Sequence, residues 1–218
     1  MSLVEHVVLM KVKDDVSPSE RDGMVERINS LVSLKQLLHL TFGPLLRIRS
    51  YPSPSFAFTH ILHTRFNSTD DLHAYAVDPT HVAVIKVNTP FIDDIMALDW
   101  LADHLHAPAA VPGSALRVTF FKLKEGLGDP VKHEVLGAIR AIQREFKHPT
   151  QLTCGENFSP GRAKGFSLAS LAVFPGLAQL EAADSDHELG NYQKNHTIKD
   201  NLDTVMLLDY LVPSSPKH

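Results

Sequence analysis

The sequence predicts an α+β fold in which two copies of one unit, each with the element order β-α-β-β-α-β, share a single chain. Two pairs of segments indicate the duplication. MKVK at 10–13 returns as FKLK at 121–124, displaced by 111 positions, and MALDWL at 96–101 returns as MLLDYL at 206–211, displaced by 110. A nearly constant displacement at both ends of a segment is typical of an internal repeat.

A segment rich in proline and small residues, HAPAAVPGS at 106–114, lies between the two copies. This composition favours a connection without regular structure. We therefore divide the chain into a first unit at 1–105, a linker at 106–113, a second unit at 114–213 and a tail at 214–218. A lone four-stranded sheet with helices on one face leaves its other apolar face bare, so we expect the two sheets to pair and close a barrel.

The composition excludes several classes of protein. Of the 218 residues, 44% are hydrophobic and 21% are charged, which is typical of a folded globular chain. The formal net charge is −4 and the 21 Lys and Arg are spread along the chain, so we expect no nucleic-acid partner. We also expect no membrane partner, because no apolar run reaches the length of a membrane span.

The cellular compartment of the protein is predicted only as a default. A strand-like segment starts almost at Met1 and leaves no room for a signal peptide, and the single cysteine, Cys154, excludes an internal disulfide. We therefore expect a cytoplasmic protein, while a plastid or a peroxisome stays open as an alternative.

The first unit begins with a strand over 3–13, in which period-two alternation places His6, Val8 and Met10 on one face. SPSE at 17–20 then supplies a Ser cap, a Pro at the first helical position and a Glu three residues after the cap. This is the pattern of a capping box, so a helix is predicted to begin there.

Two further strands are predicted at 38–49 and 56–66, separated by turn-forming residues. Alternation in the second of these strands places Phe58, His60 and Leu62 on one face.

The second helix of the first unit is predicted to be interrupted. STDD at 68–71 repeats the capping pattern, and the helix that follows carries Tyr75. Pro79 disfavours helical geometry at Asp78, so the helix should stop or kink before THVAVIKV continues it. A strand at 93–101 then completes the unit.

The second unit repeats this order with a less regular second helical region. Its strands are predicted at 115–124, 150–154, 166–174 and 204–212, with helices from 129 and from about 176.

Three segments give the chain its resemblance to a known family: EHVVLMKVKDDVSPSE, FTHILHTRFNSTDDLHAYAVDPTH and MALDW. They resemble the stress-responsive dimeric α/β barrel, or Dabb, domain in its plant tandem form. The resemblance implies two ferredoxin-like units whose sheets form a barrel within one chain, with the helices outside. It also implies a role in stress response, with some members linked to defence against fungi. Further homodimerisation of the whole chain stays open.

The first unit also resembles the polyketide cyclases of this family, of the olivetolic acid cyclase type, around YAVDPTH at 75–81. The resemblance implies that Tyr75 and His81 are catalytic and that His6 and His60 lie in the pocket. Phe58 and Leu62 are expected to add apolar surface for an alkyl tail.

Chemistry supports these roles. A neutral imidazole suits a base that removes a proton beside a carbonyl, so we expect His81 to be the base, and the Tyr75 hydroxyl can hydrogen-bond the developing enolate. A purely structural role for these residues stays open as the alternative. Tyr75 lies at helical spacing from Leu72, which packing on the sheet also explains, and in a chain with 13 histidines several lie together by chance.

The second unit lacks this constellation, because Arg117 aligns with His6, Leu168 with His60 and about Ala183 with Tyr75. Neither the spacing of the histidines nor a glycine-rich loop indicates a metal or nucleotide, so we expect no metal and no cofactor.

Two functions therefore remain in view. The first is a stress-related barrel that binds a small apolar molecule, and the second is an enzyme that catalyses an aldol-type cyclization. A pocket beside Tyr75, with His81 free of structural partners, would favour the enzyme.

Overall fold

The computed structural model describes residues 3–51, 56–102, 110–145, 148–185 and 188–213. The predicted α+β class and the element order of both halves are confirmed. The first half contains β1 (Leu3–Val12), α1 (Pro18–Ser30), β2 (Leu37–Pro44), β3 (Arg47–Tyr51), β4 (His60–Phe66), α2 (Thr69–Ala76), α3 (Pro79–Asn88) and β5 (Ile92–Ala102). The second half contains β6 (Ala115–Leu123), α4 (Asp129–Arg144), β7 (Gln151–Glu156), β8 (Leu168–Phe174), α5 (Leu177–Ser185), α6 (Glu188–Lys194), α7 (His196–Asn201) and β9 (Leu202–Leu211).

Local sequence explains where the helices of the first half begin. Ser17 and Glu20 form the predicted capping box at α1, and the Ser68 side chain caps α2 by accepting from the amide of Asp71. The predicted interruption is also confirmed: Asp78 has extended backbone geometry and caps a new helix, α3, whose first residue is Pro79. The second half differs, because α4 starts after Gly128 and has no side-chain cap.

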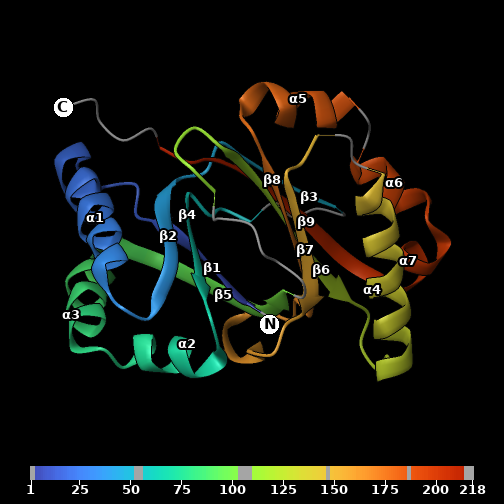
Figure 1. Cartoon of the computed structure of the whole chain (residues 1–218), viewed down its shortest axis with the longest axis horizontal. Coiled ribbons are helices and arrows are strands. Elements are labelled where there is room, and N and C mark those ends of the chain that lie inside the picture. The colour runs from blue at the N-terminus through green and yellow to red at the C-terminus, as the bar shows by residue number, and fades with distance from the viewer. Residues whose placement is uncertain (1–2, 52–55, 103–109, 146–147, 186–187, 214–218) are drawn as a thin grey trace.

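Two antiparallel sheets, with strand orders β2-β4-β1-β5 and β3-β9-β6-β8-β7, face each other across the molecule (Figure 1). The predicted strand 38–49 is wrong in one respect, because it is two strands that belong to different sheets. After Pro44 the chain leaves the first sheet, and β3 pairs with β9 of the second half. The first half therefore supplies an edge strand to the sheet of the second half.

The two edges of the barrel are joined by equivalent hydrogen bonds. The amide of Leu46 donates to the carbonyl oxygen of Asp209 at 2.9 Å, and the amide of Phe158 donates to the carbonyl oxygen of Asp99 at 2.9 Å. Asn157 also forms an isolated bridge with Trp100. These bonds give the barrel an approximate twofold symmetry within one chain.

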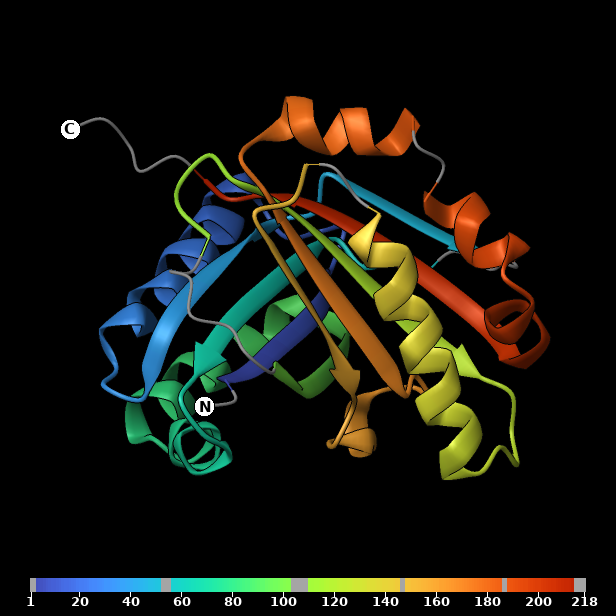
Figure 2. The same ribbon diagram turned by 45° about the vertical axis from the view of Figure 1, so that its right-hand side comes forward.

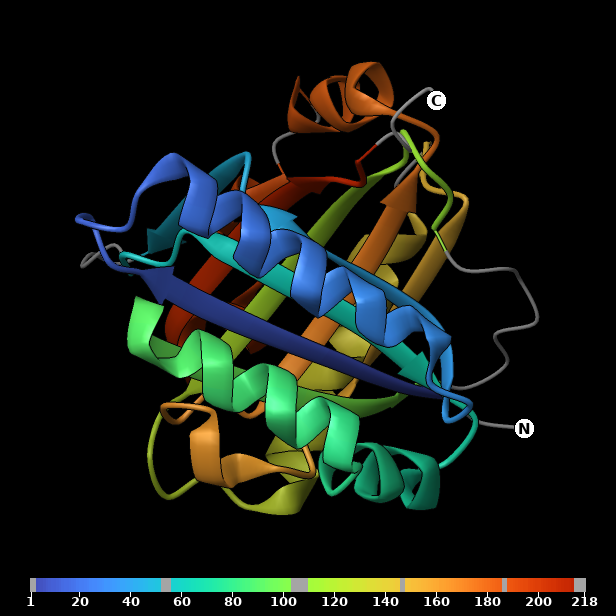
Figure 3. The same cartoon turned by 90° about the vertical axis from the view of Figure 1, so that its left-hand side faces the viewer.

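The barrel interior is apolar and is built by both halves. Its buried side chains come from the inward faces of strands in both sheets, as with Val7, Leu98, Val118 and Leu208. Helices α1 to α3 cover the outer face of the first sheet, and α4 and α7 lie over the second (Figures 2 and 3). In the part of the chain that the structure describes, no helix combines the length and hydropathy of a membrane span.

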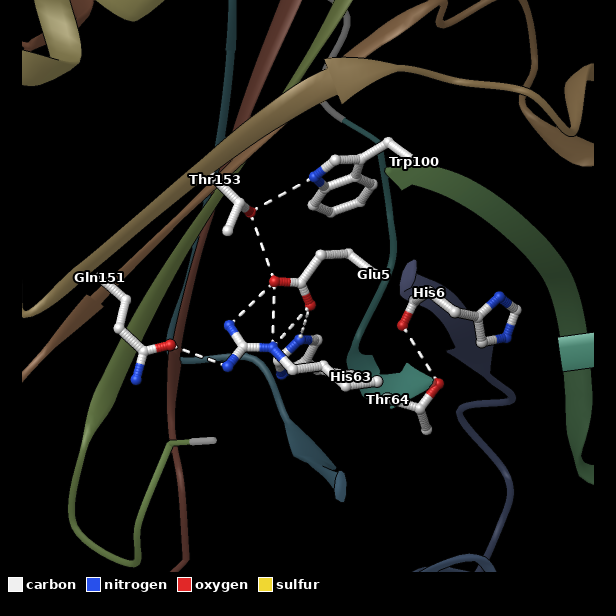
Figure 4. Close-up of polar contacts among 8 residues, drawn as sticks. Glu5, His6, His63, Thr64, Trp100, Gln151 and Thr153 are labelled. Carbon is white, nitrogen blue, oxygen red and sulfur yellow. Dashed lines mark hydrogen bonds and ion pairs between the residues drawn. The ribbon is translucent and has the colours of Figure 1, made fainter. Parts of the chain in front are cut away.

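A buried charged cluster interrupts this apolar interior (Figure 4). The carboxylate of Glu5 accepts from Arg65 Nε at 3.0 Å and contacts His63 Nε2 at 2.7 Å, and all three side chains are buried. Arg65 also donates to Gln151 at 2.8 Å, and Thr153 donates to Glu5 at 3.4 Å. The cluster therefore ties the first half to β7 of the second.

Burial and charge act in opposite directions on this cluster. Burial alone would raise the pKa of Glu5, but the charges and hydrogen bonds of His63 and Arg65 outweigh it and lower the pKa to about 2. Burial lowers the pKa of His63. Glu5 is thus an anion at neutral pH, paired with the guanidinium of Arg65.

Candidate functional site

A cavity of about 620 Å³ lies between the outer face of the first sheet and helices α2 and α3. Most of its lining is apolar, and its polar side chains are few. It is lined by His6, Val8, Met10, Leu62, Leu72, Tyr75, Ala76, His81, Val82, Ile85, Lys86, Ile95, Ala97 and Arg162. The size and composition are those of a site for a small organic molecule.

The break between α2 and α3 brings Tyr75 and His81 together. Asp78 Oδ1 accepts from the amide of Thr80 at 2.8 Å, which fixes the start of α3. The chain direction therefore changes between the two aromatic residues, and their rings lie 4.2 Å apart between centroids at an angle of 42°. Both side chains line the cavity.

The Tyr75 hydroxyl is a buried polar group without a partner among the described residues. The side chain is 2% exposed, and burial raises the pKa of its phenol. The hydroxyl is therefore protonated at neutral pH and keeps its capacity to donate a hydrogen bond. An unsatisfied buried hydroxyl has a free-energy cost of about 1–3 kcal/mol, so this group, on a residue that lines the cavity, calls for an explanation.

The His81 ring is oriented by the backbone. Its Nδ1 lies 3.2 Å from the carbonyl oxygen of Ala76, and because a carbonyl can only accept, this contact assigns the proton to Nδ1. The lone pair of the neutral ring is then on Nε2. Burial lowers the pKa of His81, so the neutral form with a basic Nε2 predominates at neutral pH.

A second histidine is oriented by a carboxylate. His6 on β1 and Asp99 on β5 are directly opposite each other in the sheet, and His6 Nδ1 hydrogen-bonds Asp99 Oδ1. Burial alone would raise the pKa of Asp99, but the hydrogen bond and charge of His6 outweigh it and the pKa lies below its usual value. Asp99 thus holds the ring through Nδ1 and leaves Nε2 available.

The second half supports this carboxylate. The amide of Asp99 donates to Asn157 Oδ1 at 3.0 Å, and Ser159 hydrogen-bonds the Asp99 side chain. A short 3-10 helix, Pro160–Arg162, follows and places Arg162 in the lining of the cavity. The site of the first half is therefore completed by residues 157–162 of the second.

The equivalent positions of the second half form an ion cluster instead. Arg117 on β6 is opposite Asp209 on β9, in the register of His6 and Asp99. Arg117 donates to both oxygens of Asp209, at 2.8 and 3.1 Å, and Arg47 and Arg49 of β3 each donate to Oδ2 at 3.1 Å. A carboxylate bound to three guanidinium groups cannot orient a base.

Comparison with known proteins agrees with this duplicated barrel. The model of the stress responsive A/B barrel domain, Dabb, matches residues 4–102 and 116–212. The chain belongs to the Dabb family. It is 44% identical over 98% of its length to a stress-response A/B barrel domain-containing protein of Arabidopsis thaliana, covering 80% of that protein. It is 41% identical to a second such protein of the same plant, covering 98% of this chain and 99% of that one.

Solved structures share the Dabb barrel architecture at low sequence identity. A candidate monooxygenase from Fusobacterium nucleatum gives a TM-score of 0.64 at 12% identity, covering 97% of this chain and 93% of that one. An anthrone oxidase-like protein gives a TM-score of 0.60 at 11% identity, covering 97% and 91%. At these identities the likeness shows the fold alone.

The structure brings together four of the six residues that the sequence indicated for this Dabb site: His6, Leu62, Tyr75 and His81 all line the cavity. His60 and Phe58 are not among its lining residues. His60 stacks on Phe42, with ring centroids 5.6 Å apart, and its Nδ1 contacts Thr59 Oγ1 at 2.8 Å. Burial, with a smaller effect of Arg21, lowers its pKa to about 4.

Phe58 lies on the opposite side of the sheet from Leu62. It packs in the barrel interior with Ile61, because β4 begins only at His60 and the alternation does not extend back to residue 58.

Sequence reasoning missed two residues of the site, Asp99 and Arg162. A signal for Asp99 was present, because the repeated segments MALDWL and MLLDYL carry an aspartate at the same position, Asp99 and Asp209. The sequence offers no comparable signal for Arg162, which reaches the cavity only through the pairing of the two halves.

Residues 106–109 of the linker predicted at 106–113 lie outside the described part of the chain.

Proposed function

We propose that this Dabb protein binds a small, largely apolar molecule in the first-half cavity. The observation that carries the proposal is an apolar cavity of about 620 Å³ lined by Tyr75, whose buried hydroxyl has no partner among the described residues. A bound molecule with one acceptor would satisfy this hydroxyl and bury its apolar remainder against Leu62, Leu72 and Ile85. A role in defence against fungi is part of this proposal and rests on the family resemblance alone.

Native mass spectrometry after incubation with fatty acids and aromatic polyketides tests this function. We expect a bound mass for the full chain and its loss in Ala97→Phe, which fills the cavity from β5. Ala141→Phe on the exposed side of α4 is the matched control and should keep the ligand. Equal binding by both variants would place the ligand elsewhere and contradict the proposal.

A second candidate function, proton abstraction leading to aldol-type cyclization, is favoured by the orientation of both histidine rings. His81 Nε2 would remove a proton from the carbon beside a ketone, while the Tyr75 hydroxyl donates to the carbonyl oxygen and stabilises the enolate. The enolate carbon then forms a bond with a second carbonyl carbon of the same molecule. The resulting alkoxide takes back the proton held by the imidazolium, so the first step is balanced without a cofactor.

Exchange of hydrogen for deuterium tests the chemical step without knowledge of the natural substrate. A methyl ketone with an apolar chain is incubated with the protein in D₂O, and exchange beside the carbonyl is followed by NMR. We expect acceleration by the native chain and about a hundredfold loss in His81→Ala. His133→Ala on the exposed face of α4 is the control. Exchange that persists unchanged in both His81→Ala and Tyr75→Phe would exclude these roles.

A further inference from the structure

The otherwise apolar cavity of the first half is lined by two exposed cationic side chains, Lys86 and Arg162, and we call the part of the cavity beside them its mouth. Lys86 comes from the end of α3, and Arg162 comes from the 3-10 helix of the second half. Both are exposed, and neither has a hydrogen-bond or ion-pair partner among the described residues. A second hollow of about 400 Å³ is also lined by Arg162, together with Met10, so this side chain lies where the two spaces meet.

The carboxylates near this mouth already have partners. Asp93 pairs with Lys11 at 3.3 Å, and Asp94 pairs with Lys164 at 2.8 Å. Asp99 is hydrogen-bonded by His6 and by Ser159. Asp93 and Asp94 line the second hollow together with Arg162, but no ion pair joins Arg162 or Lys86 to a carboxylate of the described residues.

We propose that the ligand of this cavity is an apolar carboxylic acid whose carboxylate is bound at the mouth by Arg162 of the second half. This inference rests on the ligand binding proposed above and adds the chemical class of the ligand. A carboxylate inside the apolar cavity would lose its hydration at high cost, whereas at the mouth it keeps part of its water and gains the guanidinium. The apolar remainder then extends inward toward Tyr75.

The planar guanidinium makes Arg162 the main contact and Lys86 a supporting charge. Arginine binds a carboxylate through two parallel hydrogen bonds, while lysine acts as a single compact charge. The inference also gives the second half a direct part in ligand recognition. The first half alone has the cavity and both oriented histidines, but it lacks the arginine.

Decanoate and decanamide are the probes, because they share one tail and differ in the charge of the head group at neutral pH. Isothermal titration calorimetry measures each against the full chain, Arg162→Gln, Lys86→Gln and the control Arg144→Gln on the exposed face of α4. We expect native protein to prefer decanoate, and Arg162→Gln to weaken decanoate about fivefold or more while decanamide is unchanged. Lys86→Gln should have a smaller effect and Arg144→Gln none.

Three outcomes would overturn the inference. If both probes bind equally and Ala97→Phe removes both, the cavity binds ligands without a carboxylate preference, so the ligand class fails while the proposed function stands. If Lys86→Gln removes the preference and Arg162→Gln does not, the assignment to Arg162 fails. If neither probe binds, the apolar acid and the binding function fail together.

Discussion

Replacing Arg65 by methionine should destabilise the barrel by about 3 kcal/mol. Arg65 and Glu5 are 1% and 0% exposed, and the substitution leaves the Glu5 carboxylate buried with only His63 and Thr153 beside it. Against the opposing effect of burial, His63 and Arg65 together lower the pKa of Glu5 from 4.5 to about 2, so the substitution removes one of the two groups that stabilise the charged form. Removing one partner of a buried ion pair costs about 3–5 kcal/mol, which sets the size of the expected loss.

Urea unfolding at neutral pH, followed by circular dichroism, measures the change in the free energy of unfolding. The control is Arg144→Met on the exposed face of α4, which should change stability by less than about 0.5 kcal/mol. The double variant Glu5→Gln with Arg65→Met should lose less free energy of unfolding than the sum of the losses in the two single variants, because it removes both charges of the pair. A loss below about 1 kcal/mol in Arg65→Met, or additive effects, would refute the reasoning.

Three further predictions concern acid, the cavity and the two halves. The pKa values of His39 and His60 are lowered to about 3 and about 4, so below about pH 6.5 the unfolded chain binds more protons than the folded chain. The free energy of unfolding should therefore fall as pH drops from about 6.5 toward 4. A urea midpoint that stays constant over that range would contradict this. Tyr75→Phe should keep or slightly raise the melting temperature, because the lost hydroxyl has no partner among the described residues. The same variant should reduce deuterium exchange in a bound ketone. A melting temperature lowered by more than about 5 °C would mean that the hydroxyl is structural. A fragment of residues 1–105 should be insoluble or form a homodimer, because β1, β4 and β5 would expose the face that now packs on the second half. Light scattering measures the mass of the fragment in solution. A stable monomer would argue against the prediction.

Most of the fold could be predicted from local signals in the sequence. The capping box at Ser17, the N-cap at Ser68 and the Asp78-Pro79 break depend on neighbouring residues only, and the structure confirms each of them. The duplication was also visible, because strands at equivalent positions need similar residues. Elements whose physics is local were therefore predictable from a single sequence.

Features that depend on the pairing of the two halves were not predictable in the same way. The division of 38–49 into β2 and β3 is caused by the crossing of the chain from one sheet to the other, where Leu46 meets Asp209. Arg162 reaches the cavity for the same kind of reason, and no pattern within its own segment, CGENFSPGR, indicates it. The prediction that Phe58 shares a face with Leu62 is wrong, because alternation holds only within a strand and β4 begins at His60.

The covalent joining of two barrel halves explains how one half can keep oriented histidines while the equivalent positions of the other form an ion cluster. In a symmetric homodimer every position occurs twice, so a residue that suits only one of the two sites is also imposed on the other. Here the same register position carries His6 in one half and Arg117 in the other, each opposite an aspartate. Asp99 hydrogen-bonds one nitrogen of the His6 ring, whereas Asp209 is bound by guanidinium groups from both halves. The second half is thereby free to stabilise the barrel and to supply Arg162 to the cavity of the first, a division of roles that requires the two sequences to differ.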